Sequence, residues 1–123
     1  MRLRPNEHRL MSVKRYDISS TCYDKKGNIL AVGRNSYSKS SPWQKELSVK
    51  AGLSEHRIVL HSEVSALLKC KDKKVYSMQI ERYNKDGTMG LAFPCPSCQI
   101  ALKQRGVKIV RFTSPEGWRE WLV

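Results

Sequence analysis

The stretch Ile58-Val59-Leu60-His61-Ser62-Glu63-Val64-Ser65-Ala66-Leu67-Leu68 is the part of this chain from which the rest can be interpreted. It begins as a short apolar run, and its later apolar residues recur at helical spacing. We therefore predict an extended segment that turns into a helix from His61 to Lys69. His61 and Glu63 then stand together at the helix start, where an imidazole and a carboxylate would point into the same space.

A second stretch, Pro94-Cys95-Pro96-Ser97-Cys98, lies between another extended apolar run and a predicted helix. Its second proline suits the first helical turn, where a missing amide hydrogen costs little. Two cysteines spaced Cys-x-x-Cys at a helix start can converge on one metal ion, and the positive end of the helix favours their thiolate form. Together with His61 they supply three ligands of a catalytic zinc site with an open fourth position, and Glu63 is left to move protons.

The length of 123 residues predicts a single domain with a real hydrophobic core. We place a polar leader at residues 1–13 and the catalytic domain at residues 14–123. No run approaches the ~20 apolar residues of a membrane span, and the first residues lack the apolar segment of a secretory signal. We therefore expect a cytoplasmic protein without a membrane partner, whose four cysteines do not form a disulfide framework.

The formal net charge of +12 favours anionic partners such as nucleotides or nucleic acid. The basic residues are scattered, so a merely solubilising surface is the alternative.

The order of the predicted elements is that of an α/β protein. Residues 15–35 are predicted to form a β-hairpin, with its turn at residues 24–28. The further predicted elements are a short helix at 43–51, a strand at 75–82, a helix at 97–105, a strand at 107–112, and a final short helix that opens at Ser114 and carries Trp118, Trp121 and Leu122.

The two motifs resemble the signature of the zinc-dependent cytidine and deoxycytidylate deaminase superfamily, H-x-E followed by P-C-x-x-C. The order of elements is also similar to that family's fold, so the resemblance covers most of the chain. It implies a three-layer α/β/α sandwich of the cytidine deaminase-like type, with a central mixed sheet of about five strands opening with a β-hairpin. It also implies one catalytic Zn²⁺ per chain, held by His61, Cys95 and Cys98, with Glu63 as the proton shuttle.

Several substrate contacts are implied by the same resemblance. Asn35 follows the second predicted strand, where the family usually places an asparagine that contacts the substrate sugar. Ser62 would offer its backbone amide to the base, and Pro94 would shape the pocket wall. Independently of the resemblance, Trp43 in the loop after the hairpin is a candidate for base stacking, with packing in the core as the alternative.

The chain departs from the family's pattern in three places, one of which is a separation from Glu63 to Cys95 that is somewhat longer than in compact members of the family. Ser62 stands where the family usually has alanine, a small change that should be tolerated. Deoxycytidylate deaminases that respond to nucleoside triphosphates often carry a Gly-Tyr-Asn-Gly-like stretch, and here the residues are Gly33-Arg34-Asn35-Ser36, so we do not expect that regulation. A histidine as the first ligand is more similar to the nucleotide and nucleic-acid branches than to the free-nucleoside branch.

The implied reaction is hydrolytic deamination of a nucleobase, with cytosine to uracil in a (deoxy)cytidine nucleotide such as dCMP as the leading expectation. One alternative is deamination of cytosine or adenine within single-stranded DNA or RNA, which the net charge supports. Another is a non-catalytic, zinc-stabilised nucleic-acid-binding module, which would leave Glu63 without a task. Because members of the superfamily commonly assemble, we also expect a homo-oligomer.

Overall fold

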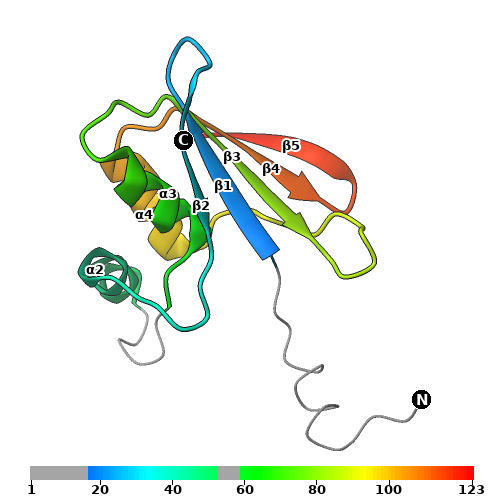
Figure 1. Ribbon diagram of the computed structural model, residues 1–123, viewed down its shortest axis with the longest axis horizontal. Helices are drawn as coiled ribbons and strands as arrows, with labels where there is room; N and C mark the ends of the chain where they lie inside the picture. The colour runs from blue at the N-terminus through cyan, green and yellow to red at the C-terminus, as the bar shows by residue number, and fades with distance from the viewer. Residues whose placement is uncertain (1–16, 53–58) are drawn as a thin grey trace, which may run out of the picture.

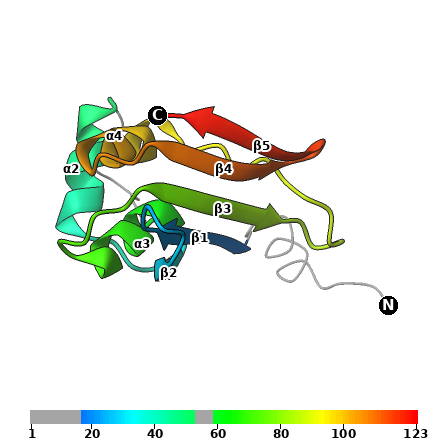
Figure 2. The ribbon, with the colours of Figure 1, turned by 90° about the horizontal axis from the view of Figure 1, so that it is seen from above.

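The computed structural model describes residues 17–52 and 59–123. The predicted leader, residues 1–13, lies outside the described residues, as does Ile58. The described chain folds around one five-stranded sheet whose strands lie side by side in the order β2-β1-β3-β4-β5 (Figures 1 and 2). The strands are Asp17–Tyr23 (β1), Ile29–Arg34 (β2), Ser77–Tyr83 (β3), Ile109–Ser114 (β4) and Gly117–Leu122 (β5).

The sheet is mixed, because β3 and β4 run parallel while the other neighbouring pairs run antiparallel. Its first two strands form the predicted hairpin. The turn is closed by Asp24, whose Oδ1 accepts hydrogen bonds from the amides of Lys26 and Asn28 at 2.9 Å each. Gly27 takes a positive φ of 88° there, which glycine adopts at no steric cost.

Three helices of nine residues each complete the described structure: Pro42–Lys50 (α2), Ser62–Cys70 (α3) and Pro96–Gln104 (α4). They confirm the three predicted internal helices. Helix α2 starts at Ser41, whose hydroxyl oxygen accepts the amide of Gln44 at 3.0 Å, and this cap fixes the helix start. None of the described helices is long and apolar enough to cross a membrane.

Helices α3 and α4 lie on the same side of the sheet (Figure 1). Helix α3 connects β2 to β3 and α4 connects β3 to β4, and both connections move across the sheet in the same direction. Crossovers between parallel strands are right-handed, so both helices must cover one face. The predicted cytidine deaminase-like α/β fold, with a mixed five-stranded sheet that opens with a hairpin, is confirmed. Within residues 17–52 and 59–123 the helical layer covers this one face.

Gly33 brings α3 close to the sheet. A Cβ atom at this position would lie 2.6 Å from the carbonyl oxygen of Ser62 and would also overlap the backbone of Ala66. Only a residue without a side chain lets β2 and α3 approach so closely. The start of α3 is thereby held against the sheet, beside a core to which α3 contributes Val64, Ala66 and Leu67, all fully buried.

The prediction of a final helix is wrong, because residues 117–122 form the strand β5. Gly117, with φ +111°, closes a turn in which the Ser114 hydroxyl donates to the Gly117 carbonyl at 2.6 Å. The strand then pairs antiparallel with β4 along its whole length. Trp121 lies opposite Val110 and makes an edge-to-face contact with Phe93, with ring centroids 5.2 Å apart. The edge of β4 and this aromatic contact favour strand over helix.

Two strand boundaries also differ from the prediction. Strand β3 covers Ser77–Tyr83 where residues 75–82 were expected, and β4 covers Ile109–Ser114 where residues 107–112 were expected. Arg82, the last residue of the predicted strand, lies one residue before the end of β3 and is paired with Ile18.

Candidate active site

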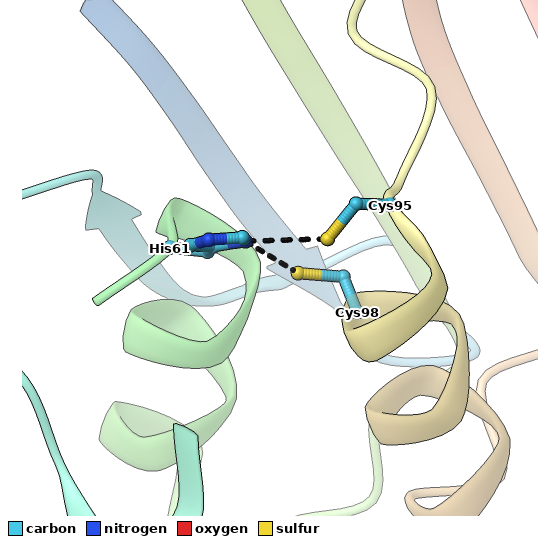
Figure 3. A group of neighbouring side chains, drawn as sticks. All are labelled: His61, Cys95 and Cys98. Carbon is cyan, nitrogen blue, oxygen red and sulfur yellow. Dashed lines mark hydrogen bonds between the residues drawn. The ribbon is translucent and has the colours of Figure 1, made fainter. Parts of the chain in front are cut away.

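The two predicted motifs meet where α3 and α4 begin side by side (Figures 1 and 3). His61 occupies the N-cap position of α3 and Cys95 that of α4, and both have extended backbone. Neither side chain caps its own helix. Their donor atoms instead point toward each other and toward Cys98, in the first turn of α4 (Figure 3). The backbone amide of His61 is held in place by Gln44, whose Oε1 accepts it at 3.1 Å.

The three donor atoms form one compact group. The Nδ1 atom of His61 lies 3.3 Å from the Sγ atom of Cys98 and 3.4 Å from that of Cys95. All three atoms lie within 4.8 Å of one another, and among the residues described this is the group of histidine, cysteine and acidic side chains that could hold a metal ion. Zinc bonds of ~2.0–2.1 Å to nitrogen and ~2.3 Å to sulfur at tetrahedral angles separate two such ligands by ~3.5 Å. The donor set and its spacing therefore fit zinc.

Hydrogen bonds between the three side chains shift their pKa values in a way that favours binding of a metal cation. Hydrogen bonds from Cys98, His61 and Ser97 lower the pKa of the Cys95 thiol to about 3, against its burial. The same contact with Cys95, together with burial and the nearby Glu63 carboxylate, raises the pKa of Cys98. The hydrogen bond to Cys95 raises the pKa of His61. The metal-free group thus holds one thiolate already, and binding zinc would release the protons that remain on the other ligands.

Glu63 lies beside this group without being part of it. Its side chain is only 7% exposed, and its charge acts on both His61 and Cys98. Its Oε1 atom accepts a hydrogen bond from the Ser62 hydroxyl at 2.7 Å, and the Ser62 and Ser20 hydroxyls lie 2.8 Å apart. Both serines are buried. A carboxylate held in this way, next to three candidate metal ligands, is placed to transfer protons.

A cavity of about 290 Å³ opens in front of these side chains. Its apolar lining comes from the chain before α3, from β1 and β3, and from the chain before α4: Ile18, Val59, Leu60, Ile80, Leu91, Ala92 and Phe93. Its polar lining consists of Asn35, Ser36, Tyr37, His61, Ser62, Glu63, Arg82 and Cys95. Most of the surface that these residues present to the cavity is apolar, and the polar groups converge on it, as is typical of a small-molecule site.

Only some of the residues predicted to contact the substrate line this cavity. Asn35 and Ser62 line it. Asn35 is fixed to β1 by two hydrogen bonds. Its side-chain Oδ1 accepts the Ile18 backbone amide at 3.0 Å, and its backbone amide donates to the Ile18 carbonyl at 3.2 Å. Pro94 is fully buried, between two lining residues, and its carbonyl accepts the Gln99 side-chain amide at 2.9 Å.

Trp43 is not among the residues that line this cavity. Its indole Nε1 donates to Gln104 at the end of α4, at 3.2 Å, and its ring packs against the core. Tyr37, from the same loop, lines the cavity instead. Ser20 and Arg82, which both lie on predicted strands, were not predicted as site residues. The alternation of Ile80 and Arg82 on one face of the strand predicted at residues 75–82 was the available signal for Arg82.

Comparison with known proteins supports the fold. No protein-family model matches the chain, and no curated protein matches it. A solved cytidine deaminase from Mycobacterium tuberculosis is similar in structure, with a TM-score of 0.50 at 17% identity over 87% of this chain and 73% of that one. A mutant cytidine deaminase from the same organism gives a TM-score of 0.51 at 16% identity, over 87% of this chain and 74% of that one. This chain therefore shares the fold of cytidine deaminases.

Proposed function

We propose that this protein is a zinc-dependent deaminase that hydrolyses the exocyclic amino group of a nucleobase, converting cytosine to uracil in a (deoxy)cytidine nucleotide such as dCMP. The observation that carries the proposal is the meeting of His61, Cys95 and Cys98 at 3.3–3.4 Å with a separate, buried Glu63 at the wall of one cavity. The cytidine deaminase-like fold supports it.

Zinc, when bound by His61, Cys95 and Cys98, would supply Lewis-acid activation of water at neutral pH. Glu63 performs the proton transfers. Its carboxylate accepts a proton from the attacking water, delivers it to N3 of the ring, and passes the second proton to the amino group at C4, which leaves as ammonia. Cytosine and water are thereby converted into uracil and ammonia. The Ser62 hydroxyl keeps the carboxylate oriented during these transfers.

The apolar part of the cavity suits a planar base and excludes bulk water from the reacting atoms. Ile18, Ile80 and Phe93 supply such surface. The edge-to-face contact of Phe93 with Phe112, at 5.2 Å between centroids, holds its ring in position. Asn35, fixed to β1 by two hydrogen bonds, is proposed to contact the sugar.

A second candidate is deamination of a base within single-stranded DNA or RNA, which the formal net charge of +12 favours. The salt dependence of binding and activity distinguishes these two candidate functions. Binding to a polynucleotide that neutralises several phosphates weakens steeply with salt, whereas action on a mononucleotide responds much less.

The test is a screen for base conversion by the zinc-loaded protein. Cytidine, deoxycytidine, adenosine, their monophosphates and short oligonucleotides are incubated with enzyme, and the bases are separated by chromatography alongside an ammonia assay. We expect uracil and ammonia in equal amounts from a cytosine mononucleotide. Conversion of adenine alone, or no conversion of any substrate by protein with one zinc per chain, would contradict the proposal.

A further inference from the structure

Three connections of the chain lie together at the end of the sheet where helices α3 and α4 finish (Figure 1). They are residues 24–28 between β1 and β2, residues 71–76 between α3 and β3, and residues 105–108 between α4 and β4. Backbone hydrogen bonds join them, because the Tyr76 amide donates to the Tyr23 carbonyl at 2.8 Å and the Lys108 amide donates to the Tyr76 carbonyl at 2.8 Å. The three connections therefore form one continuous surface, the basic end.

Positive charges that are scattered along the sequence gather at the basic end. Its three connections carry seven lysines and arginines and two aspartates, whereas the described connections at the opposite end carry two lysines and two acidic side chains. The connections at the opposite end are residues 35–41, 59–61, 84–95 and 115–116. Six of the seven basic side chains are exposed lysines: Lys25, Lys26, Lys71, Lys73, Lys74 and Lys108. Of the two aspartates, Asp24 already accepts three hydrogen bonds within its own turn.

Stabilisation of the helix ends does not account for this cluster. Cations near a helix C-terminus interact favourably with its last carbonyls. Arg105 already does so for α3, because its Nη1 donates to the Leu67 carbonyl at 2.8 Å and its Nη2 to the Lys71 carbonyl at 2.7 Å. Lys25 lies in a hairpin turn and Lys108 directly before a strand. Within residues 17–52 and 59–123 none of the exposed lysines of the basic end forms an ion pair, so their mutual repulsion favours an anionic partner.

A second cavity, of about 330 Å³, opens where the three connections meet. One lysine from each connection lines it, Lys25, Lys74 and Lys108, together with Arg105 and Tyr76. Among the described residues no acidic side chain lines this cavity. Cations in a concave surface with an aromatic ring among them are typical of proteins that bind single-stranded nucleic acid. A flat bilayer would reach lysines that protrude but not cations that line a cavity, so the surface favours a flexible strand over a membrane.

The second cavity is separate from the one in front of Glu63. The two have no lining residue in common. Helices α3 and α4 start at the candidate metal ligands and finish at the basic end, and nine residues at 1.5 Å per residue place ~13 Å between the two ends. A strand held at the basic end therefore does not by itself bring a base to Glu63.

We propose that the basic end is a second binding surface, which holds the phosphate backbone of a single-stranded nucleic acid apart from the catalytic cavity. Its lysines contact phosphates, and such contacts carry no base preference. Arg105 acts as a positioning residue that ties α4 to the connection bearing most of these lysines. The inference goes beyond the proposed function and does not depend on it, because a protein bound to a polynucleotide can act on a mononucleotide.

The test uses fluorescently labelled oligo(dT) of about 20 nucleotides, longer than the ~4–16 nucleotides of a typical single-strand site. Oligo(dT) contains neither cytosine nor adenine, so it is not a substrate of the proposed reaction. Its dissociation constant is measured by fluorescence anisotropy over a series of salt concentrations. The triple variant Lys25→Gln, Lys74→Gln, Lys108→Gln removes one exposed lysine from each connection. The logarithm of the affinity falls with that of salt by ~0.7 per phosphate neutralised, so we expect this slope to fall by ~2 and binding at ~0.1 M salt to weaken on the order of 100-fold.

The matched control is the triple variant Lys39→Gln, Lys85→Gln, Arg119→Gln, which removes three exposed charges from the opposite end and from β5. We expect it to bind oligo(dT) within a few-fold of the wild type. If both triple variants weaken binding equally, only the overall charge attracts the strand, and the proposal is overturned. A larger loss in the control variant would place the strand at the catalytic end, which overturns the proposal and supports deamination within a single strand.

Other anionic partners are compared on the wild-type protein in the same buffer, with a DNA duplex of equal length and with phosphatidylserine vesicles. We expect oligo(dT) to bind most tightly. Tighter binding of the duplex, or binding of vesicles without binding of oligo(dT), would overturn the assignment to a single strand.

Turnover separates this inference from the proposed function. We expect the Lys25, Lys74 and Lys108 triple variant to convert dCMP at the wild-type rate while losing oligo(dT). Wild-type protein that binds oligo(dT) through these lysines but converts no cytosine substrate refutes the deaminase activity alone. Protein that converts dCMP but binds oligo(dT) equally well with and without the three lysines refutes the binding surface alone.

Discussion

The end of the cavity with the candidate metal ligands (the metal end) and the end proposed to receive the substrate (the substrate end) are built in different ways. The metal end comes from two short segments, residues 61–63 and 95–98, each fixed by the start of one helix. The substrate end is assembled from residues on separate strands and loops, among them Ile18, Asn35 and Arg82, which meet only because β1 pairs with β3 and Asn35 binds β1. Local sequence therefore places the candidate metal ligands and Glu63, while the register of the sheet places the residues that line the rest of the cavity.

The largest expected effect is at the metal end. His61→Ala and Cys95→Ala each remove one of three ligands, so we expect zinc content to fall from one ion per chain to near zero, measured by atomic emission after gel filtration. Cys70→Ala is the matched control, because its thiol is buried in the core outside the ligand group. If both ligand variants keep a full equivalent of zinc, the ligand assignment is wrong.

The packing that joins the two ends is tested at Gly33. Gly33→Ala would push α3 away from β2, and we expect a loss of unfolding free energy of ~1–3 kcal/mol, as in other overpacked cores, measured by urea titration. Because Gly33 contacts the backbone at Ser62, zinc affinity should fall as well. Gly27→Ala is the comparison: it has open space around an added Cβ and pays only for its positive φ. A stability change at Gly33 no larger than at Gly27 would contradict the close approach.

A thiol comparison separates the metal end from the core. In metal-free protein the lowered pKa of Cys95, about 3, keeps it a thiolate at every pH above that value, so its alkylation rate should change little between pH 5 and pH 7. Burial raises the pKa of Cys22, which should stay unmodified over the same range. Iodoacetamide labelling followed by peptide mass spectrometry measures both. Labelling of Cys95 that rises steeply only above pH 8 would contradict the low pKa.

The smallest expected effect concerns the two buried serine hydroxyls. Ser62→Ala removes the hydrogen bond to Glu63, and we expect kcat to fall by a factor of a few, corresponding to ~1 kcal/mol for one hydrogen bond. The double variant with Ser20→Ala should cost less than the sum of the single variants, because the hydroxyls are bonded to each other. Fully additive effects on kcat would show that the pair does not act as a unit.

The sequence predicted the metal end because histidine, glutamate and the two cysteines lie within short motifs whose helical starts fix their directions. The hairpin and three helices were predicted for the same local reasons. Residues 117–122 were misassigned because a segment with two tryptophans fits either a helix face or an edge strand, and only the exposed edge of β4 decides. For Trp43 the sequence left base stacking and core packing open, because its bond to Gln104, sixty-one residues away, is a contact that no local pattern contains.

The central claim is that Glu63 moves the protons while other residues hold the metal. It is tested most directly by measuring uracil formation and zinc content on the same samples of wild-type protein and Glu63→Ala, with Glu46→Ala, an exposed carboxylate on α2 paired with Lys50, as the control. We predict one zinc per chain in all three, and a loss of turnover on the order of 10²- to 10⁴-fold in Glu63→Ala alone. Turnover by zinc-loaded Glu63→Ala equal to that of the wild type would contradict the account.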